Sequence, residues 1–193
     1  MKRLLMKRLL FINACVRAES RTRRLAEELL SGWQGEICEL NLEQMDLRPL
    51  TAETLARRDA LLAAGDYADP AFEPARALVE ADAVVLAAPY WDCSFPASVK
   101  VFVEQVMVNG LTFTFTADGV PHGKCRAKKL WYVSTAGGPV VGTNLGFAYI
   151  RQVSSLYWGI PEAELIQAEG LDLVGADPEA ILSAAAADLP RLL

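Results

Sequence analysis

The feature that most constrains the fold is an alternation of short apolar runs with segments of helical periodicity, almost from end to end. The first run, LLFINA, is typical of a strand that is buried on both faces. Ser20 then caps a helix with one apolar face. Four further apolar or alternating runs predict strands, at residues 36–42, 81–89, 128–136 and 163–170. Helical patterns follow the last three of them, at residues 96–107, 146–159 and 176–189.

This alternation predicts an α/β fold. Strands that alternate with helices pair in parallel and carry helices on both faces of the sheet. Five strands suit a doubly wound, flavodoxin-like sheet in the order 2-1-3-4-5, counted along the chain. Residues 43–75 form a long excursion after the second strand, and within it residues 52–65 predict one helix that ends at Gly65. At 193 residues the chain can bury a substantial core, so we expect one domain over residues 1–193.

Composition argues against several classes of function. The net charge is −5, and Lys and Arg are scattered, so we expect no nucleic-acid partner. No segment reaches the ~18 apolar residues of a membrane span. Lys7 and Arg8 leave LLFINA too short for the apolar region of a signal peptide. The repeated MKRLL also suggests that Met6 rather than Met1 is the native start.

The cysteines predict neither disulfides nor a metal centre. They are widely spaced and form no Cys-x-x-Cys motif, and the one histidine, His122, adds little to any zinc site. We therefore expect no metal and a cytoplasmic protein with reduced thiols. The four residues are Cys15, Cys38, Cys93 and Cys125.

Three unusual stretches follow the first, third and fourth predicted strands. They read CVRAESRT (15–22), PYWDCSF (89–95) and STAGGP (134–139). In an open parallel sheet, ligands bind beyond the carboxyl ends of the strands, at the point where the strand order reverses. For the order 2-1-3-4-5, these three loops meet at that point. The sequence therefore predicts a ligand site formed by all three.

Each loop offers chemistry suited to a phosphorylated aromatic ligand. The first ends at a helix N-terminus, where free N–H groups attract an anion, and Ser20, Arg21 and Thr22 add hydroxyls and charge. The second has adjacent aromatics that could frame a flat ring, and the third has Gly137 next to Gly138, which allows close approach of the backbone. Each also has a plainer explanation: a helix cap, a surface turn and a tight turn.

The first loop also supports a different reaction. Cys15 and Arg21 have the Cys-x5-Arg spacing of low-molecular-weight tyrosine phosphatases, Thr22 supplies the following hydroxyl, and Asp177 precedes a proline as the general acid does in that family. Glu19 lies inside the loop and would repel the phosphate. The loop has no glycine, and Asp-Pro-Glu is also an ordinary helix start. The phosphatase is therefore the weaker alternative.

Taken together, the three loops resemble the flavodoxin-like NAD(P)H:quinone oxidoreductases, and specifically the FMN-dependent NADH azoreductase group, over nearly the whole chain. In that family a Ser-x-Ser segment holds the FMN phosphate, which matches Ser20, Arg21 and Thr22. A tetrapeptide lies along the isoalloxazine ring, which matches Tyr90, Trp91, Asp92 and Cys93. A Ser/Thr-x-Gly-Gly turn matches Thr135, Ala136, Gly137 and Gly138.

The resemblance implies bound FMN, with NADH or NADPH as the electron donor. It implies a ping-pong transfer of two electrons to a quinone, azo or similar flat aromatic acceptor. It also implies a homodimer with active sites at the interface. Backbone N–H groups of Asp92 and Cys93 would contact the N5/O4 edge of the flavin, and those of Gly137 and Gly138 would stabilise charge near N1/O2. The slot for the acceptor would have walls from Trp91, Phe95 and Tyr149.

The match is not complete. The hydroxyl that the family often has at the end of the first strand is Ala14 here, the frequent Asn of the ring-edge loop is Asp92, and Pro139 and Val140 follow the glycines where some relatives have a histidine. No catalytic side chain is therefore assigned. A flavodoxin-like electron carrier without enzymatic activity remains a further alternative.

Overall fold

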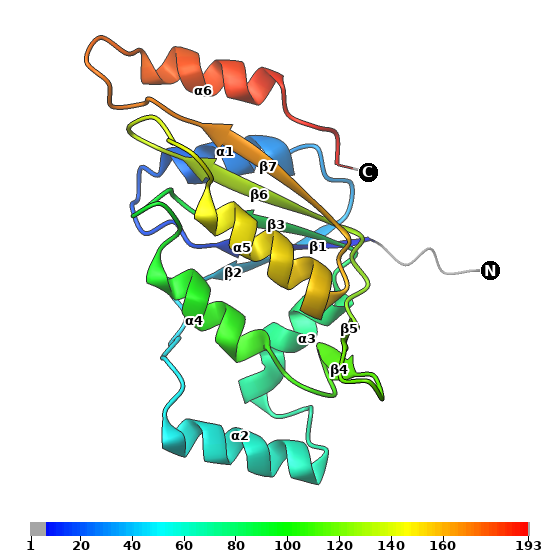
Figure 1. Cartoon of the computed structure of the whole chain (residues 1–193). Coiled ribbons are helices and arrows are strands. Elements are labelled where there is room, and N and C mark those ends of the chain that lie inside the picture. The colour runs from blue at the N-terminus through cyan, green and yellow to red at the C-terminus, as the bar shows by residue number, and fades with distance from the viewer. Residues whose placement is uncertain (1–6, 193) are drawn as a thin grey trace, which may run out of the picture.

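The computed structural model describes residues 7–192, and its centre is a five-stranded parallel sheet (Figure 1). The strand order is β2-β1-β3-β6-β7, which is the predicted order 2-1-3-4-5 of the five sheet strands. The choice between Met1 and Met6 as the native start lies outside the described residues. The strands are β1 (Arg8–Asn13), β2 (Glu36–Asn41), β3 (Ala83–Ala87), β6 (Lys129–Thr135) and β7 (Glu162–Ala168).

Helices cover both faces of this sheet (Figure 1). Side chains alternate along each strand, so that in β1 Leu10 and Ile12 enter one core while Leu9 and Phe11 enter the other. The first core is closed by α3 (Glu73–Glu80), α4 (Ala97–Val106) and α5 (Leu145–Val153), and the second by α1 (Arg21–Leu30) and α6 (Pro178–Ala187). Every residue of β3 is buried, as its apolar sequence predicted.

The predicted excursion contains the predicted helix. This helix, α2 (Ala52–Ala64), ends at Gly65, whose φ of 68° is the left-handed conformation that glycine favours. None of its residues is fully buried, but Leu61 and Leu62 pack against the first core, and Figure 1 shows the helix at the periphery of the molecule. Arg58 links this helix to α4, because its guanidinium donates hydrogen bonds to the carbonyl oxygens of Glu104 (2.9 Å) and Met107 at the end of α4.

We expect Arg58→Met to lower the free energy of unfolding by about 1.5–3 kcal/mol, because it removes two partly buried hydrogen bonds from a charged donor to backbone carbonyls. Burial lowers the pKa of this guanidinium, so these bonds also offset a cost of desolvation. Arg57→Met is the matched control, since Arg57 makes only an exposed contact with Asp69 and should change stability by less than about 1 kcal/mol. Equal urea-denaturation curves for the two variants would contradict the prediction.

The structure differs from the sequence prediction in three places. A short 3-10 turn, η1 (Pro70–Phe72), lies within the excursion, and helix α3, which begins at its end, precedes β3. The predicted helix over residues 146–159 ends in a π-helical turn, η2 (Ser154–Trp158), after α5. An antiparallel hairpin of β4 (Phe113–Phe115) and β5 (Pro121–Gly123) lies outside the main sheet. Three-residue strands are too short for an alternating pattern to show.

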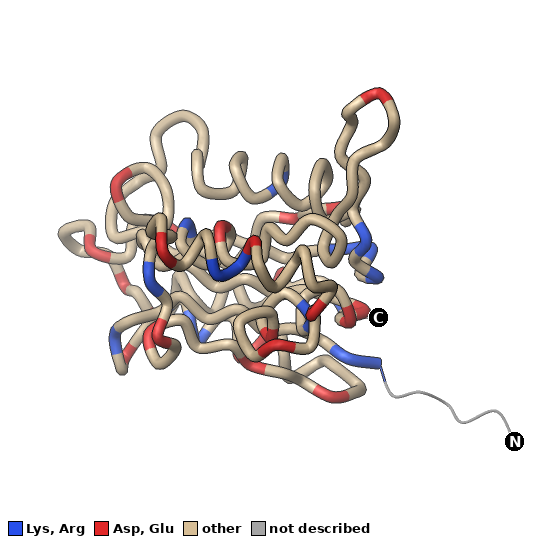
Figure 2. The backbone as a smooth tube through the Cα atoms, turned by 90° about the horizontal axis from the view of Figure 1, so that it is seen from below, with Lys and Arg blue, Asp and Glu red and all other residues tan. Residues whose placement is uncertain are grey.

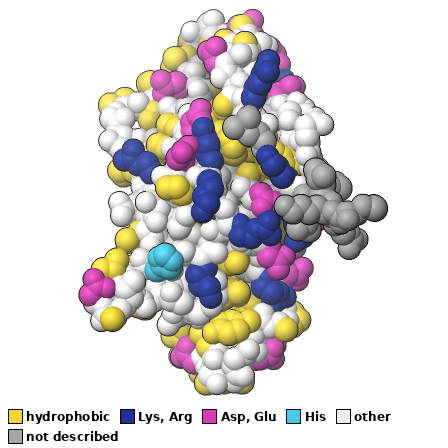
Figure 3. All heavy atoms as spheres, turned by 90° about the vertical axis from the view of Figure 1, so that its right-hand side faces the viewer, with side chains coloured by type: hydrophobic (Ala, Val, Ile, Leu, Met, Phe, Trp, Pro, Cys, Tyr) yellow, Lys and Arg dark blue, Asp and Glu magenta, His cyan; other side chains and the backbone are white. Residues whose placement is uncertain are grey.

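Figure 2 shows Lys and Arg positions interspersed with Asp and Glu positions along the described backbone. The one histidine, His122, is exposed on β5 and is the cyan side chain of Figure 3. Within residues 7–192, no helix has the length and apolar character needed to cross a membrane.

Candidate functional site

A pocket of about 360 Å³ lies at the carboxyl edge of the sheet. It is lined by the loops that follow β1, β3 and β6, which are the three loops singled out from the sequence, and by a fourth loop that follows β7. The structure therefore brings the predicted stretches together at the switch point of the sheet. The predicted stretches also contribute lining residues that had no assigned binding role, namely Val16, Arg17, Glu19 and Pro89. Leu171 and Asp172 line the pocket from outside those stretches.

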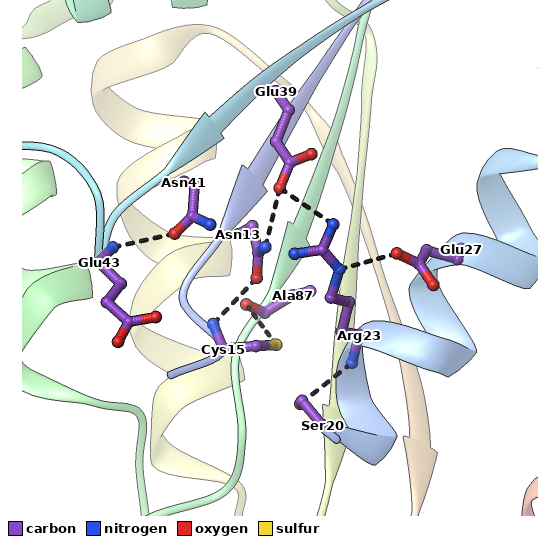
Figure 4. A network of polar contacts seen from close by, with 9 residues as sticks. All are labelled: Asn13, Cys15, Ser20, Arg23, Glu27, Glu39, Asn41, Glu43 and Ala87. Carbon is purple, nitrogen blue, oxygen red and sulfur yellow. Dashed lines mark hydrogen bonds and ion pairs between the residues drawn. The ribbon is translucent and has the colours of Figure 1, made fainter. Parts of the chain in front are cut away.

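The first loop is held at its base by Asn13, the last residue of β1. Its side chain is completely buried, accepts a hydrogen bond from the Cys15 N–H (3.0 Å) and donates one to Glu39 on β2 (2.8 Å). Arg23 on α1 reaches the same Glu39 (3.8 Å), so the loop, the helix and the neighbouring strand are joined in one network (Figure 4). Asn13 was not singled out from the sequence, although a polar residue inside the apolar run LLFINA is the pattern that indicates such a role.

The start of α1 faces the pocket. Ser20 caps the helix, with its hydroxyl accepting from the Arg23 N–H (3.3 Å). The N–H groups of Arg21 and Thr22, in the first helical turn, have no intrahelical partner and remain available to an anion. The Thr22 hydroxyl is buried and hydrogen-bonded to the Thr135 hydroxyl (2.6 Å), which joins the first loop to the third.

The second loop is a strained reverse turn. Asp92 and Cys93 have φ of 50° and 64°, and Trp91 and Ser94 are joined by two backbone hydrogen bonds of 3.2 and 2.7 Å. Two positive φ values between paired residues define a type I′ turn, which glycine and asparagine favour. Within the described chain, the N–H groups of Asp92 and Cys93 donate to no protein acceptor. Tyr90 and Trp91 line the pocket, whereas Asp92 and Cys93 are exposed at the tip of the turn.

The third loop has its carbonyl groups occupied and its N–H groups free. The carbonyl oxygens of Gly137 and Gly138 accept from Asp172 (2.8 Å) and Gly170 (3.1 Å), and that of Ala136 accepts from Leu171 (3.2 Å). No acceptor within residues 7–192 takes the N–H of Gly137 or Gly138. The loop after β7 thus holds one side of the Gly-Gly turn and leaves two donors on the other side.

Cys15 does not have the environment of a nucleophile. Its side chain belongs to the apolar core, its Sγ donates weakly to the Ala87 carbonyl (3.9 Å), and burial raises the pKa of the thiol to about 11. At pH 7 only about one such thiol in ten thousand is ionised, and the thiolate is the reactive form. Asp177 caps α6 and is not in the pocket lining. These positions contradict the phosphatase alternative.

Phe95 and Tyr149, suggested as walls for an acceptor, pack edge to face with ring centroids 5.6 Å apart. Neither lines this pocket, and Tyr149 instead lines an open apolar groove between α2, α4 and α5. Within residues 7–192, no three His, Cys, Asp or Glu side chains are placed to hold a metal ion together.

Comparisons with known proteins agree with this architecture. A family profile described as a flavodoxin-like fold matches residues 7–193. The FMN-dependent NADH:quinone oxidoreductase 2 of Clostridium acetobutylicum is 32% identical over 190 residues, covering 92% of this chain and 93% of its own. The FMN-dependent NADH:quinone oxidoreductase of Stenotrophomonas maltophilia is 30% identical over 191 residues, covering 95% of this chain and 94% of its own.

The fold has solved relatives as well. An FMN-dependent NADH-azoreductase from Bacillus anthracis, solved in complex with FMN, superposes with a TM-score of 0.78 over 95% of this chain and 96% of its own, at 18% identity. An azoreductase from Bacillus anthracis str. Sterne gives a TM-score of 0.77 over 95% and 97%, at 21% identity. At these identities the likeness shows the fold alone.

The sheet order and the pocket at its switch point define an α/β protein of flavodoxin-like fold, with a pocket where such sheets bind their ligands. The profile match and the curated relatives place it more narrowly. The chain belongs to the flavodoxin-like family that includes the FMN-dependent NADH:quinone oxidoreductases, which confirms the resemblance inferred from the three loops.

Proposed function

We propose that this protein is an FMN-dependent oxidoreductase that transfers two electrons from NADH or NADPH to quinone, azo or similar flat aromatic acceptors. One observation carries the proposal. Three loops that are distant in sequence line one pocket at the carboxyl edge of the sheet, and within the described chain the first and third of them place backbone N–H groups without an acceptor in its lining, at Arg21, Thr22 and Gly137. The names of the curated relatives, which are FMN-dependent NADH:quinone oxidoreductases, support it.

The residues of the pocket fit FMN. The N-terminus of α1, with the free N–H groups of Arg21 and Thr22 and the Arg21 side chain, suits the phosphate. The ring needs hydrogen-bond donors along its polar edge and apolar contact on its faces. The turn around Asp92 and the Gly137–Gly138 turn supply donors, and Tyr90 and Trp91 supply aromatic surface. When bound, FMN supplies the hydride and electron chemistry that side chains lack.

The contribution of the chain itself is orientation and electrostatics. Donors at Gly137 and Gly138 are held in place by the loop after β7, so they require little reorganisation when negative charge develops beside them. No ionisable side chain is assigned to hydride transfer. We infer a ping-pong sequence because one open pocket would have to receive donor and acceptor in turn.

We also propose that the protein is a homodimer with its active sites at the interface. The support is an open, mainly apolar groove of about 470 Å³, whose walls include Leu55, Val103, Met107, Tyr149 and Val153. A partner that fills this groove would remove apolar side chains at its rim, such as Leu55, from water. The four free cysteines suit a reducing compartment, and we propose the cytoplasm.

A visible absorption spectrum and one activity assay test this function. The protein purified with FMN should be yellow and should oxidise NADH or NADPH in the presence of a quinone or azo dye. A yellow protein with no NADH or NADPH oxidation would instead be a flavodoxin-like carrier. A colourless protein that takes up no added FMN would contradict both. Cleavage of an aryl phosphate that is lost in Cys15→Ser would revive the phosphatase.

A further inference from the structure

Asp172 is the one acidic residue that the loop after β7 places in the pocket lining, and it contacts two of the predicted binding elements. Its Oδ1 accepts a hydrogen bond from Nη1 of Arg21 (2.6 Å), a residue 151 positions away at the start of α1. The pair therefore bridges the first and the fourth loops across the pocket.

The carboxylate is held there by the backbone. The Asp172 N–H donates to the Gly137 carbonyl (2.8 Å), so the residue is fixed beside the Gly-Gly turn. The other carboxylate oxygen lies so close to Gly137 that a Cβ on that glycine would be 2.3 Å from it. Asp172 thus fills the space that the missing side chain of Gly137 leaves, next to free N–H donors.

The charges around the pocket balance. Its charged lining residues are Arg17, Glu19, Arg21 and Asp172, two of each sign. Arg23 and Arg24, on the same helix, pair elsewhere with Glu27 and Glu179. A phosphate group brings a charge of about −1.5 to −2 at pH 7. To bind Arg21, a phosphate group has to replace Asp172 as its ion-pair partner or share the guanidinium with it. A ligand without a phosphate does not compete for Arg21.

We propose that Asp172 is a specificity-determining residue, whose carboxylate competes with the phosphate of the ligand for Arg21. This inference rests on the proposed function and refines it. The carboxylate reduces the preference of the pocket for a flavin with a 5′-phosphate, FMN, over the same ring and ribityl chain without it, riboflavin. The structure assigns this role to a loop that none of the three predicted stretches includes.

Asp172→Asn tests the proposal, because asparagine keeps the shape and the backbone N–H but removes the charge. Dissociation constants for FMN and riboflavin are measured by quenching of flavin fluorescence. We expect FMN to bind roughly two- to fivefold more tightly, as the loss of one competing exposed ion pair implies. Riboflavin affinity should stay within about twofold, since no phosphate then competes.

Two further variants make the test specific. Glu179→Gln removes a comparable exposed ion pair, with Arg24 on the same helix, and should change neither affinity because Glu179 lies outside the pocket lining. In an Arg21→Gln background, Asp172→Asn should lose most of its effect on FMN, because the two residues act through one contact.

The outcomes distinguish failure of the role of Asp172 from failure of the proposed function. Wild-type protein that binds neither flavin overturns the proposed function, and the role of Asp172 with it. Wild-type protein that binds FMN, together with an Asp172→Asn variant of unchanged or weaker FMN affinity, overturns only the role of Asp172. Equal changes for FMN and riboflavin overturn it as well.

Discussion

Asp92→Pro is expected to lower FMN-dependent NADH oxidation at least about 100-fold, the effect seen when one preorganised hydrogen-bond donor is removed from an active site. Proline has no N–H, and its φ near −65° cannot match the φ of 50° that Asp92 has at the first central position of the turn. The substitution therefore removes one donor and moves the next, at Cys93. FMN affinity, measured by fluorescence quenching, should fall in parallel.

Asp92→Gly is the matched control. Glycine keeps the N–H and adopts positive φ without steric cost, so the turn should persist with its donors in place. We expect FMN affinity close to that of the wild type and a gain in stability of about 1 kcal/mol, as strain at a left-handed residue is relieved. Because the turn is exposed, Asp92→Pro should retain the far-ultraviolet circular dichroism of the wild type. A folded Asp92→Pro variant that binds FMN normally would show that this turn is not the ring-edge contact.

Gly123→Ala is expected to have the largest effect on stability, about 3 kcal/mol or more. A Cβ at Gly123, the last residue of β5, would lie 2.0 Å from the backbone nitrogen of Gly159 and 2.2 Å from the carbonyl carbon of Trp158. Backbone atoms cannot rotate away as a side chain can. The hairpin and the π-helical turn would have to separate, although the Cys125 N–H binds the Trp158 carbonyl (3.0 Å) at the same contact.

Gly32→Ala provides the comparison for that variant. Its Cβ would meet only the Leu29 carbonyl oxygen at 3.5 Å, which is an ordinary contact. Stability should be unchanged or raised by up to about 1 kcal/mol, through the lower entropy of the unfolded chain. The measurement is the free energy of unfolding from urea denaturation. Differences in the free energy of unfolding below about 0.5 kcal/mol are within the uncertainty of such comparisons. If the Gly123→Ala and Gly32→Ala proteins differ by less than that, the hairpin is not packed as described.

Much of the fold was predictable because buried strands and helices have apolar residues in recognisable runs or at regular spacing. The apolar run at residues 81–89 predicted the central strand β3, and Gly65 predicted the end of α2. The hairpin of β4 and β5 has no such pattern, since three residues are too few to show a period. A single domain over residues 1–193 remains a prediction.

The candidate site was predictable in part. The loops after β1, β3 and β6 were identified because parallel strands bring their carboxyl ends to one edge. The same rule applies to the loop after β7, but its residues, Glu169 to Asp172, carry no cluster of hydroxyls, aromatics or glycines. Its contribution to the pocket is the Leu171 side of the lining, one carboxylate and a set of backbone hydrogen bonds, which no local pattern indicates.

The sequence by itself determined the order of the sheet, and with it which loops meet at the switch point. Local patterns of apolar residues predicted the strands and helices, and the packing rules for parallel α/β sheets then favoured the doubly wound order. Only the tertiary structure decided which loop residues are buried and which partners they contact. The burial of Cys15 and the contact of Arg21 with Asp172 arise from residues far apart in sequence, because packing and hydrogen-bond geometry exist only once the sheet has formed.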